Sequence, residues 1–143
     1  MSAKLPKDID PPAWFEQAAR RRTLAETAWA TEGFTSEALE LLHESAERYL
    51  KGYLLAQGWK LVKTHDLKVL IYDAKQFNAR FGAFEEWAET LTDDFFTAQY
   101  PVDDDTDLKQ DFDDLRQQTD NLITIIKELL PQYFSSLFIP CLS

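Results

Sequence analysis

Residues 108–129, LKQDFDDLRQQTDNLITIIKEL, carry the clearest pattern in the chain. Apolar side chains and one threonine recur there at alternating spacings of four and three: Leu108, Phe112, Leu115, Thr119, Leu122, Ile126 and Leu129. Such a repeat places a continuous seam along one face of a helix that packs against antiparallel neighbours. Pro131 ends the segment, because proline cannot continue a helix. The segment therefore predicts a long helix in a bundle.

The rest of the chain also has helical spacing and contains only four glycines, which predicts an all-α protein. We expect an up-and-down bundle of four to five helices. Proline in a first turn, polar N-caps and C-terminal glycines set the expected ends. Before the final helix, the expected helices run from Asp10 to about Ala30, from Thr35 or Ser36 to Gly58, from Thr64 to about Phe77, and from about Ala83 to Gln99.

Length and composition indicate one domain, residues 1–143, with an apolar C-terminal tail at residues 132–143. A chain of this length buries roughly 70% of its unfolded surface, so it can fold without stabilising disulfides or metals. The lone Cys141 excludes an internal disulfide, and no apolar run has the length of a membrane span. We therefore expect a cytoplasmic protein with no membrane contact. A net charge of -10 argues against non-specific DNA binding.

The second expected helix has an apolar stripe and a charged face. The stripe comprises Leu39, Leu42, Ala46, Tyr49, Leu50 and Tyr53. On the opposite face, Glu44 with Arg48 and Glu47 with Lys51 are expected to form exposed pairs one turn apart. A smaller apolar strip on the flank is expected to receive another helix or a second subunit: Leu41, Gly52 and Leu55.

Motifs for nucleotide phosphates, redox cysteines and catalytic zinc are missing, and we expect no metal and no cofactor. The aspartates of residues 103–114 lack the glycine and the closing glutamate of a calcium loop, which favours a solvated loop and leaves cation binding open. His43 is expected to be a hydrogen-bonded histidine inside the bundle. His65 is expected either to stabilise a helix start or, with Lys60 and Lys63, to form a small anion site.

Four groups of residues resemble a HEPN domain (higher eukaryotes and prokaryotes nucleotide-binding), from Trp14 to about Leu130. In chain order they are Trp14, Gln17 and Ala18; Ser45, Glu47, Arg48, Leu50 and Lys51; Thr64, His65, Asp66 and Leu67; and Leu91, Thr92, Tyr100 and Pro101. Each group is short, but their order and spacing in one helical chain make the resemblance specific.

The departures from the family pattern concern catalysis. Nuclease members use an Arg-x4–6-His motif, and no arginine in this chain precedes a histidine at that distance. Gln99 stands where an arginine often precedes Tyr-Pro, and the run Arg20, Arg21 and Arg22 occurs where members often carry an acid. The resemblance therefore implies a HEPN domain that is not an enzyme. A HEPN-type ribonuclease with a displaced active site is the alternative.

What the resemblance implies is nucleotide or nucleic-acid-linked binding and regulation, with a minimal nucleotidyltransferase as partner in a toxin–antitoxin-like system. A ligand is expected between the second and third helices, where bases meet phosphate oxygens and acids orient them or bind a ribose. The expected ligand-binding residues are Glu47, Arg48, Lys51, Lys63, His65 and Asp66. The alternatives are that Glu47–Lys51 is a surface pair and His65 a helix cap, in a plain structural module.

The C-terminal tail predicts a homodimer. Its apolar side chains are Tyr133, Phe134, Leu137, Phe138, Ile139 and Leu142. An exposed patch of that kind favours association, and Gly52 on the second helix would let a partner helix approach closely. A tail that folds back onto its own bundle would hide the same residues, so both arrangements stay open.

Overall fold

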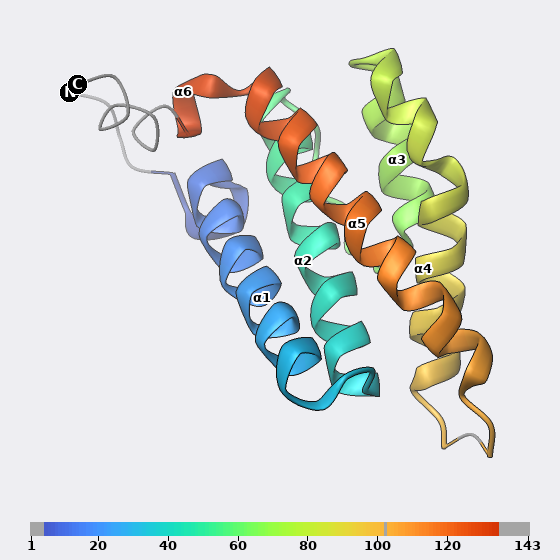
Figure 1. Ribbon diagram of the computed structural model, residues 1–143. Helices are drawn as coiled ribbons and strands as arrows, with labels where there is room; N and C mark the ends of the chain where they lie inside the picture. The colour runs from blue at the N-terminus through green and yellow to red at the C-terminus, as the bar shows by residue number, and fades with distance from the viewer. Residues whose placement is uncertain (1–4, 102, 135–143) are drawn as a thin grey trace.

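The computed structural model describes residues 5–101 and 103–134, and these are helical without any strand (Figure 1). The elements are η1 (Lys7–Ile9), α1 (Pro11–Glu32), α2 (Ser36–Ala56), α3 (Leu67–Lys75), η2 (Ala79–Phe84), α4 (Glu85–Ala98), α5 (Thr106–Leu129) and α6 (Pro131–Phe134). The predicted all-α class and packed helices are confirmed. The residues of the tail beyond Phe134, and Val102 in the acidic loop, lie outside the described ranges.

Helix α2 is the centre of the bundle, because it packs against α1, α3, α4 and α5. The connection from α1 to α2 is a tight turn. Gly33, with a φ of 74°, ends α1 in a conformation that favours glycine, and its N–H bonds to the carbonyl oxygen of Trp29. Thr35 then caps α2 by accepting a hydrogen bond from the N–H of Ala38 at 3.0 Å.

The seam of α5 packs into the core as its spacing predicts. Every predicted seam residue is buried except Leu129, which is half-buried. Thr119 fits this seam because its hydroxyl donates to the carbonyl oxygen of Leu115 at 2.7 Å and accepts from the indole N–H of Trp87 at 3.0 Å. One threonine thus satisfies the polar edge of a buried tryptophan on α4.

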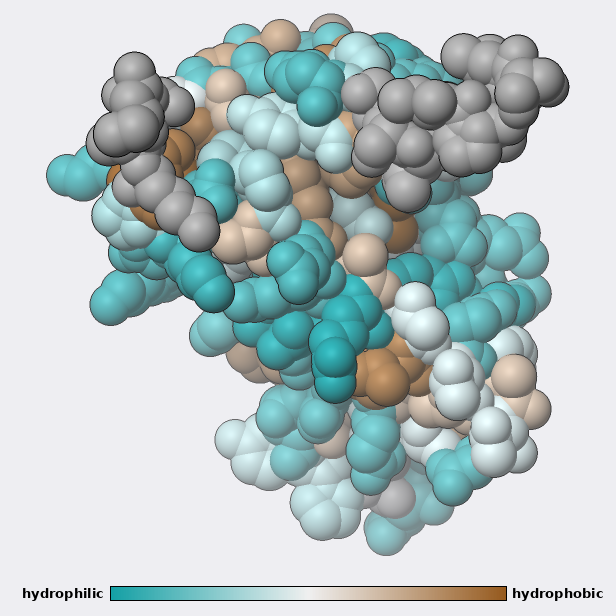
Figure 2. All heavy atoms as spheres, turned by 90° about the vertical axis from the view of Figure 1, so that its left-hand side faces the viewer, coloured by the Kyte–Doolittle hydropathy of each residue, from teal (hydrophilic) through white to brown (hydrophobic). Residues whose placement is uncertain are grey.

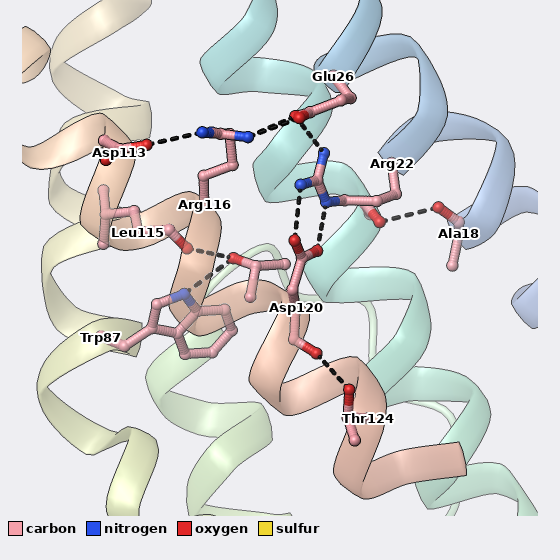
Figure 3. Close-up of polar contacts among 11 residues, drawn as sticks. Ala18, Arg22, Glu26, Trp87, Asp113, Leu115, Arg116, Asp120 and Thr124 are labelled. Carbon is pink, nitrogen blue, oxygen red and sulfur yellow. Dashed lines mark hydrogen bonds and ion pairs between the residues drawn. The ribbon is translucent and has the colours of Figure 1, made fainter. Parts of the chain in front are cut away.

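Ion pairs join the outer faces of α1 and α5 (Figure 3). Arg22 donates to both carboxylate oxygens of Asp120, at 2.7 and 3.0 Å. Arg116 binds Glu26 on α1, with its shortest contact at 2.6 Å, and also binds Asp113 on its own helix at 2.7 Å. Arg22, which belongs to the basic run of the first helix, therefore serves interhelix packing.

Gly52 is closed off by the chain's own first helix. A Cβ atom at this position would lie 2.6 Å from Cε1 of Phe15. Phe15 also contacts Phe134 of α6, with ring centroids 4.9 Å apart, so the described start of the tail folds back onto α1. Of the two occupants predicted for this strip, another helix of the same chain is the one found at Gly52. The expectation that a partner subunit's helix approaches at Gly52 is therefore wrong.

The surface on the α1 side of the molecule agrees with this arrangement. Outside the grey residues, hydrophilic side chains predominate there and hydrophobic ones appear as small separate areas (Figure 2). Scattered apolar side chains of this kind are normal on a surface and do not mark an interface.

Helix α3 starts later than its sequence predicts. Asp66, rather than Thr64, is the N-cap, because its side chain accepts from the N–H of Lys68 at 2.9 Å. Thr64 instead accepts from the N–H of Asp66 at 3.1 Å. His65 consequently lies in an extended segment ahead of the helix and not in its first turn, so the prediction of a helix-capping role for His65 is wrong.

Carboxyl groups of α4 and α5 face each other near the loop that joins the two helices. Burial, the carboxyl group of Asp111 and the charges of Asp93 and Asp107 raise the pKa of Asp94 to about 7. The unfolded value is near 3.9, so folding favours the protonated acid. Stability from this group is complete below pH 4 and is lost as the pH rises toward 7.

We expect Asp94→Asn to remove this loss. At pH 8 the variant should be more stable than the parent by on the order of 1 kcal/mol, after allowance for the part of the carboxyl that reaches solvent. At pH 4.5 the advantage should shrink toward zero. Urea unfolding between these pH values measures both, with the exposed Asp103→Asn as control. Parallel pH profiles of parent and Asp94→Asn would contradict the assignment.

Candidate functional site

Three polar residues follow one another along α2 at successive turns, and all three are buried. The exposed fractions of His43, Glu47 and Lys51 are 0%, 4% and 4%. Glu47 and Lys51 form an ion pair of 2.8 Å. The prediction of an exposed pair is therefore wrong, because residues from other elements cover it: His65 lies against Glu47, and Trp14 of α1 has its ring centroid 5.6 Å from Nζ of Lys51.

Glu47 is held as a carboxylate by two neighbours. Its Oε2 accepts from Nζ of Lys51 at 2.8 Å, and its Oε1 lies 2.9 Å from Nδ1 of His65. Burial alone would raise the pKa of Glu47, but the hydrogen bonds and charges of Lys51 and His65 outweigh burial and lower that pKa. Glu47 is thus ionised at neutral pH.

His65 is fixed at one ring nitrogen and open at the other. A carboxylate can only accept, so Nδ1 of His65 donates to Glu47 and carries the proton in the neutral ring. The side chain is 73% exposed, and Nε2 forms no hydrogen bond with any described residue. This arrangement orients the imidazole and leaves Nε2 to accept a proton or, in the protonated ring, to donate to an anion.

His43 lies beneath this pair without a hydrogen bond. Its ring stacks on Phe95 with centroids 4.0 Å apart, and its Nδ1 is 4.0 Å from Oε1 of Glu47. His43 lies inside the bundle as predicted, and the polar groups nearest to its ring are the carboxylate of Glu47 and the backbone of His65, but neither ring nitrogen forms a hydrogen bond of good geometry within the described ranges. Burial lowers the pKa of His43 to about 4, which keeps the ring neutral at neutral pH.

Two of the predicted site residues point elsewhere. Arg48 faces α1, where its Nε donates to Gln17 at 3.1 Å. Asp66 uses its carboxylate to cap α3 through the N–H of Lys68. Neither residue joins the Glu47 cluster, so the structure does not bring all six predicted ligand-binding residues together, and a ligand role for these two stays a prediction.

Lys63 is exposed and belongs to the same extended segment as His65. Lys60 is also exposed in this segment, which connects α2 to α3. The structure therefore brings Glu47, Lys51 and His65 together and places an exposed lysine two residues from the histidine.

Trp14 and His43 are members of this cluster that sequence reasoning did not assign to the site. His43 precedes Glu47 by four residues, so the helical period of α2 was a usable signal for its position. No local signal places Trp14 over Lys51, because the two lie on different helices and meet only through α1–α2 packing.

The described part of the chain has neither a candidate metal site nor a candidate membrane span. No group of three histidine, cysteine or acidic side chains there could hold a metal ion. No described helix is long and apolar enough to cross a membrane.

The HEPN domain family model matches residues 12–129, and the chain belongs to this family. The matched range contains the whole cluster of Trp14, His43, Glu47, Lys51 and His65. No curated protein and no solved structure matches the chain significantly. The predicted resemblance to a HEPN domain is thereby confirmed at the level of the family.

Proposed function

We propose that this HEPN domain is a non-catalytic module that binds the phosphate groups of a nucleotide or of a nucleic-acid segment at His65. The observation that carries the proposal is the hydrogen bond from Nδ1 of His65 to buried Glu47, which fixes an otherwise exposed imidazole. An imidazole that is already oriented loses little entropy when its protonated form donates from Nε2 to a ligand.

The charges around His65 favour an anion over a cation. The negative charge of Glu47 is balanced by Lys51 in a buried pair, so it does not repel a phosphate as a free carboxylate would. Protonated His65 donates from Nε2, and Lys63 supplies a mobile positive charge from the same segment. In this proposal Lys51 positions Glu47, and the ligand contacts are made by His65 and Lys63.

A second candidate function, a ribonuclease with a displaced active site, also has a specific observation in its favour. A histidine oriented by a carboxylate at Nδ1, with Nε2 free, has the arrangement of a general base. Among the described residues, no arginine contacts His65, because Arg48 binds Gln17 instead, so the Arg–His pair of the nuclease members is not assembled here.

We expect calorimetric titration to show binding of ATP, GTP and inorganic triphosphate by the parent protein. Lys63→Ala should weaken each by about two- to fivefold and reduce the salt dependence, because one exposed charge contact is lost. His65→Ala should weaken binding further. Lys109→Ala, an exposed lysine on α5, is the matched control and should change nothing. If the parent binds none of the three ligands, the proposed function is wrong and the alternative of a plain structural module is favoured.

Incubation with total RNA separates the two candidate functions. The proposed module produces no cleavage above a buffer control. Cleavage by the parent that is abolished in His65→Ala would instead establish the ribonuclease.

Family membership supports the further proposal of a minimal nucleotidyltransferase as partner in a toxin–antitoxin-like system. A nucleotidyltransferase gene next to the gene of this protein would strengthen it, and joint purification of the two products tests it. Purification as separate proteins would argue against the pairing.

We also propose a homodimer, and membership of the HEPN family is what supports it. Gly52 takes no part in it. Light scattering should give a mass near twice 16.6 kDa at micromolar concentration. A monomeric mass would overturn the dimer without affecting the ligand proposal.

A further inference from the structure

A cavity of about 230 Å³ lies in the groove between α3 and α4. It is lined by Lys68, Ile71, Tyr72, Lys75, Glu85 and Glu89. Pockets that enclose whole drug-sized ligands measure about 300–1,000 Å³, so this cavity has room for one small ring system and not for an entire nucleotide.

Tyr72 forms an aromatic wall of this cavity. Its exposed fraction is 64%, which is high for a tyrosine on a short helix whose other face is in the core. Lys68 and Lys75 lie four residues before it and three residues after it, so all three share one face of α3. An exposed ring between two ammonium groups suits a planar ligand that carries phosphate.

The cavity and the candidate phosphate site both reach the N-terminal end of α3. The N–H of Leu67 donates to the hydroxyl of Thr92 at 3.1 Å, which holds the start of α3 against α4. Glu89 lies one turn before Thr92, and His65 lies two residues before Leu67. The shared end of α3 is the reason to treat the cavity and His65 as parts of one ligand site.

The two ends of the cavity differ in charge balance. At one end Lys75 is paired with Glu85. At the other end, nearer His65, Lys68 and Glu89 form no ion pair within the described ranges and are available to a ligand. The carboxylate of Glu89 can accept two hydrogen bonds at once, and the ammonium group of Lys68 can only donate.

We propose that this cavity is the base subsite of the nucleotide bound at His65 and that it selects guanine; the proposal rests on the proposed function. The guanine ring stacks on Tyr72. The carboxylate of Glu89 accepts from N1–H and from the 2-amino group, two adjacent donors that adenine does not offer. Lys68 faces the phosphate that links this subsite to His65.

Calorimetric titration with GTP, ITP, ATP and inorganic triphosphate tests the subsite. GTP should bind about tenfold tighter than ATP, because each correct pair of hydrogen bonds to a base discriminates at this level. ITP, which keeps N1–H but lacks the 2-amino group, should lie between them. Inorganic triphosphate reports the phosphate site alone.

Variants separate the base from the phosphate. Tyr72→Ala should weaken the binding of GTP about tenfold, because the stacking contact with the base is lost. The binding of inorganic triphosphate should not change, because the phosphate contacts remain. Tyr72→Trp should retain GTP binding. Glu89→Gln should bring GTP and ATP to similar affinities. Tyr100→Ala removes an exposed tyrosine outside this cavity and is the matched control.

Each other outcome overturns a defined part. Equal binding of GTP, ATP and inorganic triphosphate, unaffected by Tyr72→Ala, overturns the base subsite and preserves the phosphate site. Stacking on Tyr72 without preference between GTP and ATP overturns the guanine assignment. Binding of none of the four ligands overturns the proposed function and this subsite together.

Discussion

Replacement of Glu47 by alanine is expected to lower the free energy of unfolding by about 3–5 kcal/mol, because it leaves the buried ammonium group of Lys51 without its counter-charge. Both side chains of this pair are almost fully buried, with exposed fractions of 6% and 5%, and their closest atoms are 2.8 Å apart. Urea unfolding at pH 7 measures the change. The variant also releases Nδ1 of His65, so ligand binding at that residue should weaken in parallel.

Glu44→Ala is the matched control on the same helix. Glu44 pairs with Arg21 at 2.8 Å on a side chain that is 36% exposed, so its loss should cost about 0–1 kcal/mol. The double variant Glu47→Met with Lys51→Met should recover most of the stability, since replacing a buried ion pair by apolar groups of similar size is often neutral. Equal losses at Glu44 and Glu47 would show that the pair is solvated.

Gly52→Ala is expected to destabilise the protein by up to about 2 kcal/mol. Alanine is the better helix former by about 1 kcal/mol, but overpacking of a filled core costs about 1–3 kcal/mol. Here the new Cβ would lie 2.6 Å from Cε1 and 2.9 Å from Cδ1 of Phe15, so α1 or the ring must move. Thermal unfolding measures the change.

The control for this glycine is Gly82→Ala. A Cβ there would meet only flexible side-chain atoms of Lys75 and Glu85, at 3.7 Å or more, so little change is expected. Gly52→Ala should cost less stability in a protein that already carries Phe15→Leu than in the parent, because the smaller leucine leaves room for the new Cβ. A stabilised Gly52→Ala would mean that α1 and α2 are not in close contact at this point.

The buried pair of Glu47 and Lys51 shows which parts of the site could be predicted from the sequence. Glu47, Lys51 and His65 were predicted as neighbours from the resemblance. Burial of the pair was not, because on α2 alone Glu47 and Lys51 lie opposite the apolar stripe. The segment that carries His65 and the indole of Trp14 covers them, and both contacts come from other elements.

Arg48 and Asp66 were predicted to join the same site, and the structure places them outside the Glu47 cluster. Both are charged and close in sequence to the cluster, which favoured their assignment to a ligand. In the folded chain each has a nearer structural partner, the side chain of Gln17 for Arg48 and the backbone of α3 for Asp66. Local hydrogen bonds that satisfy a helix end or a neighbouring helix compete with ligand roles and leave no mark in the sequence.

By itself the sequence determined the helices, their seams and the family, because hydrophobic period and capping residues act within a few residues of each other. The regularly spaced residues from Leu108 to Ile126 are buried as a single seam. Gly33 ends α1 and Thr35 caps α2, as the sequence predicts. Only the tertiary structure decided which charged residues are buried and what fills Gly52. Burial depends on side chains that arrive from other helices, and the sequence does not specify which ones these will be.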